Sequence, residues 1–87
     1  MRQVSTIFMD ITPAQARAAR AMIGMTQGSL AAAARVSLST VVDFERARRQ
    51  VAMPSVAAIR VALEEAGVEF IAENGGGAGV RLQKPVA

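Results

Sequence analysis

The sequence contains no cysteine, histidine, tryptophan or tyrosine, and its three aromatic residues are all phenylalanine. Without cysteine there can be no disulfide and no thiolate metal site. Without histidine the chain lacks the commonest catalytic base and the commonest zinc ligand. No pair of residues suggests a nucleophile beside its base. We therefore expect that the protein is not an enzyme and that it binds no metal and no cofactor. Such a small number of aromatic side chains also argues against recognition of single-stranded nucleic acid by base stacking.

The apolar run near the start, Ile7-Phe8-Met9, is too short for a secretory signal or a membrane span. A cytoplasmic location and no membrane partner are the resulting expectations. With 87 residues the chain is predicted to form one small domain. Such a domain buries a modest fraction of its surface, so self-association would stabilise it.

Positive charge is concentrated in the first part of the chain. Residues 1–50 hold seven of the ten Lys/Arg and three of the seven Asp/Glu, whereas residues 51–87 hold three and four. The net charge of +3 therefore comes from residues 1–50. A basic surface there is typical of phosphate contacts, although a small basic protein can also be merely well solvated.

The most informative pattern lies in residues 25–49 and predicts two short helices joined by a tight turn. Thr26 is a suitable N-cap for a helix over residues 27–34, and Ser37 for a second over residues 38–46. In the second helix an aliphatic and an aromatic residue share one face, and small polar side chains lie on the other. A short helix of this kind suits the major groove of DNA.

Two further helices are expected on either side of this pair. Thr12 and Gln15 have capping-box spacing around Pro13, which predicts a helix to about residue 23. Pro54 suits the first turn of another helix, to about residue 66. The expected core faces of these two helices are Ala16, Ala19, Met22 and Ile23, and Val56, Ile59, Leu63 and Ala66.

The pattern T-Q-x-x-L-A-x-x-A-x-V-S-x-S-T-V-x-x-F-E-R runs from Thr26 to Arg46. It resembles the helix-turn-helix of the Cro/C1-type (XRE-like) DNA-binding family, and the resemblance covers roughly residues 14–66. It implies a lambda-repressor-like fold of about four helices in which residues 38–46 form the recognition helix.

The resemblance also implies roles for individual residues. The positions that would face bases are Leu38, Ser39, Thr40 and Asp43. Gln27 would donate to a phosphate, and an ion pair between Arg20 and Glu45 would clamp the first helix to the end of the recognition helix. The position of Arg46, Arg48 and Arg49 directly after that helix favours phosphate contacts over a solvated loop.

Three features depart from the family pattern. Arg35 stands where a left-handed glycine usually makes the turn, at a cost on the order of 1 kcal/mol, and it is a further candidate for a phosphate contact. Ala47 stands where another glycine is usual, which raises the alternative that the recognition helix is one turn longer. The third departure is that residues 68–83 suggest a β-hairpin instead of a fifth helix.

Residues 68–72 and 79–83 alternate as strands, separated by a glycine-rich turn. The turn is not a phosphate loop, because no Lys-Ser/Thr pair and no helix follow it. A lone hairpin is marginal in water, so we expect a dimer interface. The residues assigned to it are Ile7, Phe8, Phe70, Ile71, Val80 and Leu82.

The expected organisation is an arm or strand over residues 1–11, a helix-turn-helix domain over 12–67, a dimerising hairpin over 68–83 and a disordered tail over 84–87. A frayed terminus is the alternative for residues 1–11. The expected function is a homodimeric transcriptional regulator that binds specific double-stranded DNA. An antitoxin that binds DNA and a toxin protein is one alternative, and a protein-interaction module without DNA binding is another.

Overall fold

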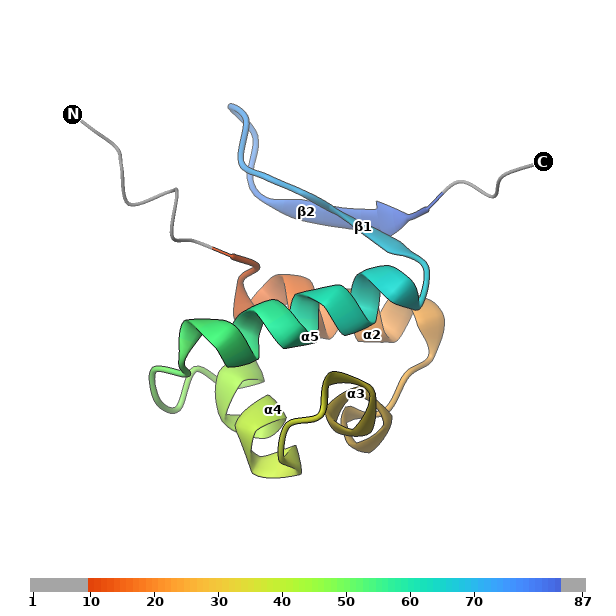
Figure 1. Cartoon of the computed structure of the whole chain (residues 1–87). Helices are drawn as coiled ribbons and strands as arrows, with labels where there is room; N and C mark the ends of the chain where they lie inside the picture. The colour runs from red at the N-terminus through yellow and green to blue at the C-terminus, as the bar shows by residue number, and fades with distance from the viewer. Residues whose placement is uncertain (1–9, 84–87) are drawn as a thin grey trace.

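The computed structural model describes residues 10–83, which form four helices followed by a two-stranded antiparallel hairpin (Figure 1). The elements are α2 (Pro13–Ile23), α3 (Gln27–Ala34), α4 (Leu38–Glu45), α5 (Met53–Glu65), β1 (Val68–Ile71) and β2 (Gly79–Leu82). The mainly α class with a C-terminal hairpin is confirmed. The expected N-terminal strand and C-terminal tail lie outside the described residues. None of these helices is long and apolar enough to cross a membrane.

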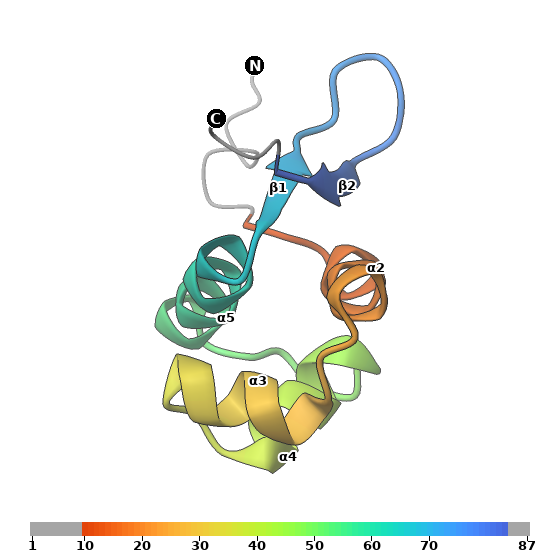
Figure 2. The ribbon, with the colours of Figure 1, turned by 90° about the vertical axis from the view of Figure 1, so that its right-hand side faces the viewer.

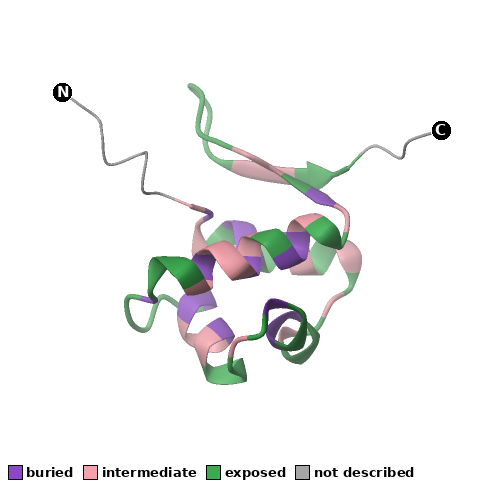
Figure 3. Ribbon diagram, viewed as in Figure 1, coloured by how far each residue is buried: buried purple, intermediate pink, exposed green. Residues whose placement is uncertain are grey.

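The elements form three levels, which both ribbon views show (Figures 1 and 2). α3 and α4 lie at one end, α2 and α5 lie in the middle, and the hairpin covers the opposite end. The core lies between the helices, where the buried positions of each helix face inward (Figure 3). Its largest fully buried apolar side chains are Leu30, Val41, Ile59, Leu63 and Val68. The two ends of the domain are therefore separated by a shared core.

Side-chain caps fix where three of the helices begin. Thr12 accepts from the amide of Gln15 at 3.0 Å, and the Gln15 side chain accepts from the amide of Thr12 at 2.8 Å, completing the capping box. Thr26 and Ser37 cap α3 and α4 through one bond each, which the side chain accepts from the amide three residues later. α5 begins without a side-chain cap, with a proline in its first turn.

Two residues expected in the core lie on the surface. Met22 is 42% exposed, because 100° of rotation per residue places it well to one side of the line through Ala16, Ala19 and Ile23. Ala66 is exposed because it is the C-cap of α5, beyond the last packed turn. Ala62 and Val68 take its place in the core.

The hairpin packs on the domain's own helices. Its register pairs Val68 with Leu82 and Phe70 with Val80. Val68 is buried, and Phe70 and Val80 pack against the helical core. Both side chains are only half-buried, so the assignment of Phe70 and Val80 to a dimer interface stays a prediction. Ile71 is also half-buried, and Leu82 is exposed, so Leu82 is the most open of the four to a partner.

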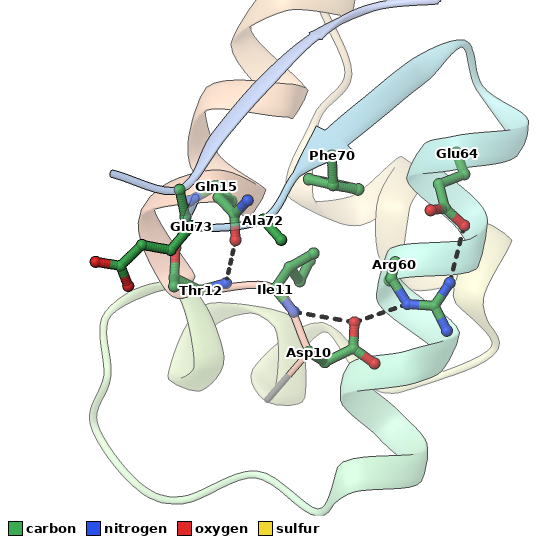
Figure 4. A pocket seen from close by; sticks show the side chains of 10 residues that line it. Asp10, Ile11, Thr12, Gln15, Arg60, Glu64, Phe70, Ala72 and Glu73 are labelled. Atoms are coloured by element: carbon green, nitrogen blue, oxygen red, sulfur yellow. Dashed lines mark hydrogen bonds and ion pairs between the residues drawn. The ribbon is translucent and has the colours of Figure 1, made fainter. Parts of the chain in front are cut away.

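Gln15 fastens the hairpin to the start of α2. Its amide nitrogen donates to the carbonyls of Gly79 at 2.8 Å and Ile71 at 3.3 Å, on both strands. Its amide oxygen completes the capping box with Thr12 (Figure 4). The side chain is buried, and its two bonds to the hairpin depend on its being an amide.

A cleft of about 510 Å³ opens between the hairpin, the start of α2 and α5 (Figure 4). On its wall, Arg60 of α5 binds Asp10 at 2.7 Å and Glu64 at 2.9 Å. Ile11 is buried in the core. Asp10 and Ile11 thus belong with the helices, and not with a separate N-terminal arm as the sequence suggested.

We predict that Gln15→Glu loosens the hairpin and leaves the helices intact. A glutamate can still complete the capping box, but its carboxylate would face two carbonyls with no hydrogen to donate. The free energy of unfolding should fall by about 1–3 kcal/mol, as for a buried polar group left unsatisfied. Hydrogen exchange should show faster exchange of hairpin amides and unchanged exchange in α3 and α4.

Gln83→Glu provides the matched control, because Gln83 is exposed just beyond β2. It makes the same chemical change near the same element without the buried contacts. If the two variants lose equal stability, the Gln15 bonds do not hold the hairpin.

Candidate nucleic-acid interface

α3 and α4 are joined by a tight turn over residues 35–37. Arg35 takes a left-handed conformation, with φ 58° and ψ 43°. The amide of Val36 binds the carbonyl of Ala31 at 3.1 Å, and the amide of Arg35 binds that of Ala32 at 3.3 Å. These two bonds make a Schellman turn, in which the left-handed position usually holds glycine. The turn expected from the sequence forms with arginine in that place.

α4 ends in the same kind of turn. The amide of Ala47 binds the carbonyl of Phe44 at 3.1 Å, and the amide of Arg48 binds that of Asp43 at 2.9 Å. Ala47 takes the left-handed position, with φ 54°. The alternative of a recognition helix one turn longer is therefore wrong. The turn satisfies carbonyls that would otherwise be orphaned, and this offsets the strain of a left-handed alanine.

The end of α4 is anchored by Glu45, whose side chain is 1% exposed. Its carboxylate accepts from Arg20 Nε at 2.6 Å and Nη2 at 2.7 Å, and from Gln27 Nε2 at 3.0 Å. We call Arg20, Gln27 and Glu45 the Glu45 clamp. It joins the last turn of α2, the first residue of α3 and the last residue of α4. The ion pair between Arg20 and Glu45 is present with bidentate geometry.

Two more contacts extend the clamp to the backbone. Arg20 Nη1 donates to the carbonyl of Met25 at 3.0 Å, in the loop between α2 and α3. Arg17 Nη1 donates to the carbonyl of Glu45. One of the last carbonyls of α4, which no residue of its own helix can satisfy, thus gains a charged donor. The hydrogen bond to Glu45 is the main cause that raises the pKa of Arg20, with burial acting against it.

Gln27 has a different partner from the one expected. The sequence assigned it to a DNA phosphate, whereas the structure directs its amide nitrogen to Glu45. That bond uses one hydrogen of the amide group, and the second hydrogen points in a different direction and can bind another acceptor. Gln27 is therefore first a part of the clamp, and its contact with a phosphate stays a prediction.

The outward face of α4 carries the residues expected to meet bases. Leu38 is 53% exposed at the start of the helix. The hydroxyl of Ser37 lies 3.1 Å from that of Ser39 and 2.8 Å from that of Thr40. This end of α4 therefore presents one apolar side chain beside a cluster of hydroxyl groups, which can exchange their mutual bonds for bonds to a ligand.

Asp43 lies on α4 and is paired with the arginines that follow the helix. Its carboxylate accepts from Arg49 Nε at 2.9 Å, and Arg48 Nη1 is 3.9 Å away. Arg49 Nη2 also reaches the hydroxyl of Thr40, at 3.4 Å. The turn at Ala47 brings these two arginines back beside α4. The sequence did not indicate this pairing, since Asp43 and Arg49 are six residues apart and in different elements.

Arg35 and Arg46 complete the positive charge around α4. Both are exposed, and neither forms an ion pair with any residue from 10 to 83. Arg35 lies in the turn before α4 and Arg46 is its C-cap. Cations thus flank both ends of a short helix whose open face is polar.

Sequence reasoning missed Gln15 as the hairpin anchor and Arg17 as a cap of α4. The sequence held a signal for Gln15, because a glutamine in a capping box still has an amide donor free for another partner, which a glutamate lacks. Nothing in the sequence pointed to the second.

A comparison with models of known protein families finds no match, and a comparison with curated proteins finds none.

We predict that Glu45→Ala destabilises the domain by about 1–3 kcal/mol, because it leaves the donors of Arg20 and Gln27 without their shared acceptor. Chemical denaturation measures the loss. A double-mutant cycle with Arg20→Ala should show that the two effects are coupled.

The control is Glu69→Ala, which breaks a similar bidentate pair with Arg81, at 3.1 and 3.2 Å, on the exposed face of the hairpin. That loss should be clearly smaller, because water screens the pair. Equal losses at the two sites, or additive effects in the cycle, would contradict the clamp.

Proposed function

We propose that the protein is a transcriptional regulator that binds specific sequences of double-stranded DNA as a two-fold dimer. The observation that carries the proposal is the surface of α4. Its open face presents Leu38, Ser39 and Thr40, and Arg49 lies against that face. A groove-sized helix with phosphate-binding groups along its side is the arrangement that the major groove requires.

The distribution of charge supports the proposal. Arg35, Arg46, Arg48 and Arg49 border α4, where they can contact the phosphates on either side of a groove. The left-handed Arg35 adds a second argument. Glycine would hold that turn without strain. An arginine that occupies it at a cost on the order of 1 kcal/mol is consistent with a use for its charge.

The Glu45 clamp supports the proposal from inside the domain. Reading base edges requires that the recognition helix be held rigidly relative to the helix that touches the backbone. Gln27 and Glu45 join the start of α3 directly to the end of α4. The clamp therefore fixes the two helices as a unit, independently of any ligand.

The arrangement of the hairpin makes a DNA-binding dimer geometrically feasible. In residues 10–83 each strand has a single neighbour, so both edges have backbone groups without a strand partner. Two copies that paired antiparallel along one edge would be related by a two-fold axis perpendicular to the sheet. Because α4 lies at the end opposite the hairpin, both recognition helices would then face the same side (Figures 1 and 2).

Leu82 is the residue best placed in such a dimer. It lies opposite the buried Val68 in the hairpin register and yet is 55% exposed. It thus extends the apolar face of the sheet beyond Phe70 and Val80, which pack against the helical core. Ile7 and Phe8, also expected in the interface, lie outside the described residues.

A protein-interaction module is the second candidate, favoured by the 53% exposure of Leu38. A leucine exposed beside polar and basic side chains would equally suit an acidic protein surface with an apolar pocket. In that case α4 would bind protein and show no preference among DNA sequences.

We predict that selection from random duplex DNA will enrich a near-palindromic sequence, with half-sites about 10 base pairs apart or a multiple of that. Leu38→Ala should change the bases preferred, by about 1–3 kcal/mol of discrimination at one position. Arg46→Ala should weaken binding to all sequences and reduce the salt slope by about one. Fluorescence anisotropy over a series of salt concentrations measures both effects.

Arg81→Ala is the control for lost charge, because Arg81 is on the hairpin at the far end of the domain. It should leave the salt slope unchanged. Failure to enrich any sequence, together with binding that does not respond to salt, would reject the proposed function.

We predict that the protein has the mass of a dimer in light scattering at tens of micromolar, and that Leu82→Glu has the mass of a monomer. The charge would be placed at a buried sheet edge, where it is strongly disfavoured. The operator affinity of Leu82→Glu should fall, since a single recognition helix would bind at a time.

Val61→Glu makes the same kind of change on an exposed apolar residue of α5, away from the hairpin. It should remain a dimer. A monomer mass for the unmodified protein, with tight binding to one half-site, would overturn the dimer.

A further inference from the structure

Asp43 has a position that the stability of α4 does not explain. It lies in the last turn of the helix, where the helix dipole disfavours negative charge. Its pairs with Arg48 and Arg49 are partly exposed, with 56% and 51% of the two arginine side chains open to solvent. Ion pairs of this kind contribute little to folding.

The same carboxylate pairs with arginines to which the proposed function assigns DNA phosphates. Arg49 Nε donates to Asp43 at 2.9 Å, and the guanidinium of Arg48 is 3.9 Å away. A carboxylate and a phosphate offer arginine the same oxygen acceptors. In the free protein, Asp43 thus occupies two of the four arginines that border the recognition helix.

The backbone keeps this arrangement in place. The bond from the amide of Arg48 to the carbonyl of Asp43, at 2.9 Å, closes the turn in which Ala47 is left-handed. The turn returns residues 48 and 49 to the side of α4, and the contact of Arg49 with Thr40 extends along that helix. The pairing is therefore a consequence of how α4 ends.

We propose that Asp43 is an internal competitor for phosphate that weakens binding to DNA in general and thereby sharpens sequence selectivity. This inference rests on the proposed function. On most sequences the arginines exchange Asp43 for phosphates, and the carboxylate is left near negative charge without a donor. On the preferred sequence a donor in the groove, such as the amino group of cytosine, compensates it. Asp43 thus disfavours wrong sequences more than it favours the right one.

The test compares Asp43→Asn with Glu69→Gln, the matched control. Both variants remove one negative charge that is paired with an exposed arginine, but Glu69 lies on the hairpin, at the end opposite α4. Binding to the selected operator and to mixed-sequence duplex DNA is measured by anisotropy at several salt concentrations.

For Asp43→Asn, affinity for mixed-sequence DNA should rise roughly fivefold, from the loss of about one unit charge beside the phosphates. Affinity for the operator should rise less, so the ratio of the two should fall. The salt slope on mixed-sequence DNA should steepen by about one. Glu69→Gln should reproduce none of these changes.

The mechanism requires that Asp43 act through its arginines. In an Arg48→Ala, Arg49→Ala background, the fivefold gain from Asp43→Asn should largely disappear. A separate readout needs no DNA: in a nitrogen-15 NMR spectrum, the Arg49 Nε–H signal should shift on Asp43→Asn and stay in place on Glu69→Gln.

The outcomes separate the two proposals. If the unmodified protein selects an operator while Asp43→Asn and Glu69→Gln behave alike on mixed-sequence DNA, the competitor role is refuted and the proposed function stands. If Asp43→Asn gains equally on the operator and on mixed sequences, selectivity is not its effect and the inference is overturned. If neither the unmodified protein nor Asp43→Asn binds duplex DNA, both proposals fall.

Discussion

The hydrogen bonds to the buried carboxylate of Glu45 hold α2, α3 and α4 together. A charged group that is 1% exposed is tolerable only when its acceptors are satisfied, and three side-chain donors do so. Those donors come from α2 and α3, so the need to pair one charge fixes three helices relative to one another. The apolar core would hold these helices together but would leave their relative rotation less strictly defined. A buried hydrogen-bond network restricts the distances and angles between helices more strictly than alanine-rich packing does.

The turns before and after α4 show how local strain is used. Arg35 and Ala47 both adopt left-handed conformations that glycine would adopt at no cost. In each case the chain gains a Schellman turn, and in each case the turn sets the position of arginine side chains. The first places Arg35 at the start of α4, and the second returns Arg48 and Arg49 to its side. The charged border of α4 is thus determined by backbone geometry as much as by composition.

Much of this could be predicted from the sequence where the signal was local. Capping residues located the starts of α2, α3 and α4, and the change of period after Gly67 located the hairpin. The Arg20–Glu45 pair followed from resemblance and not from spacing, since the residues are 25 positions apart. What could not be predicted depended on tertiary geometry. Gln15 bonds the hairpin 56 and 64 residues away, and Asp43 meets Arg49 only because the chain reverses at a left-handed alanine.

The separation of the two ends of the molecule links these observations. The hairpin and α4 lie at opposite ends of the described domain, but both are bonded to α2 (Figure 2). Gln15 in its first turn holds the hairpin, and Arg20 in its last turn holds Glu45 of α4. A single eleven-residue helix therefore sets both the edge available for a second copy and the direction in which α4 faces. Because α2 is hydrogen-bonded at both ends, the spacing between the two copies of α4 in the proposed dimer would be set by α2 together with the pairing of the hairpin edges. Such a dimer could discriminate half-site spacing without any flexible connection.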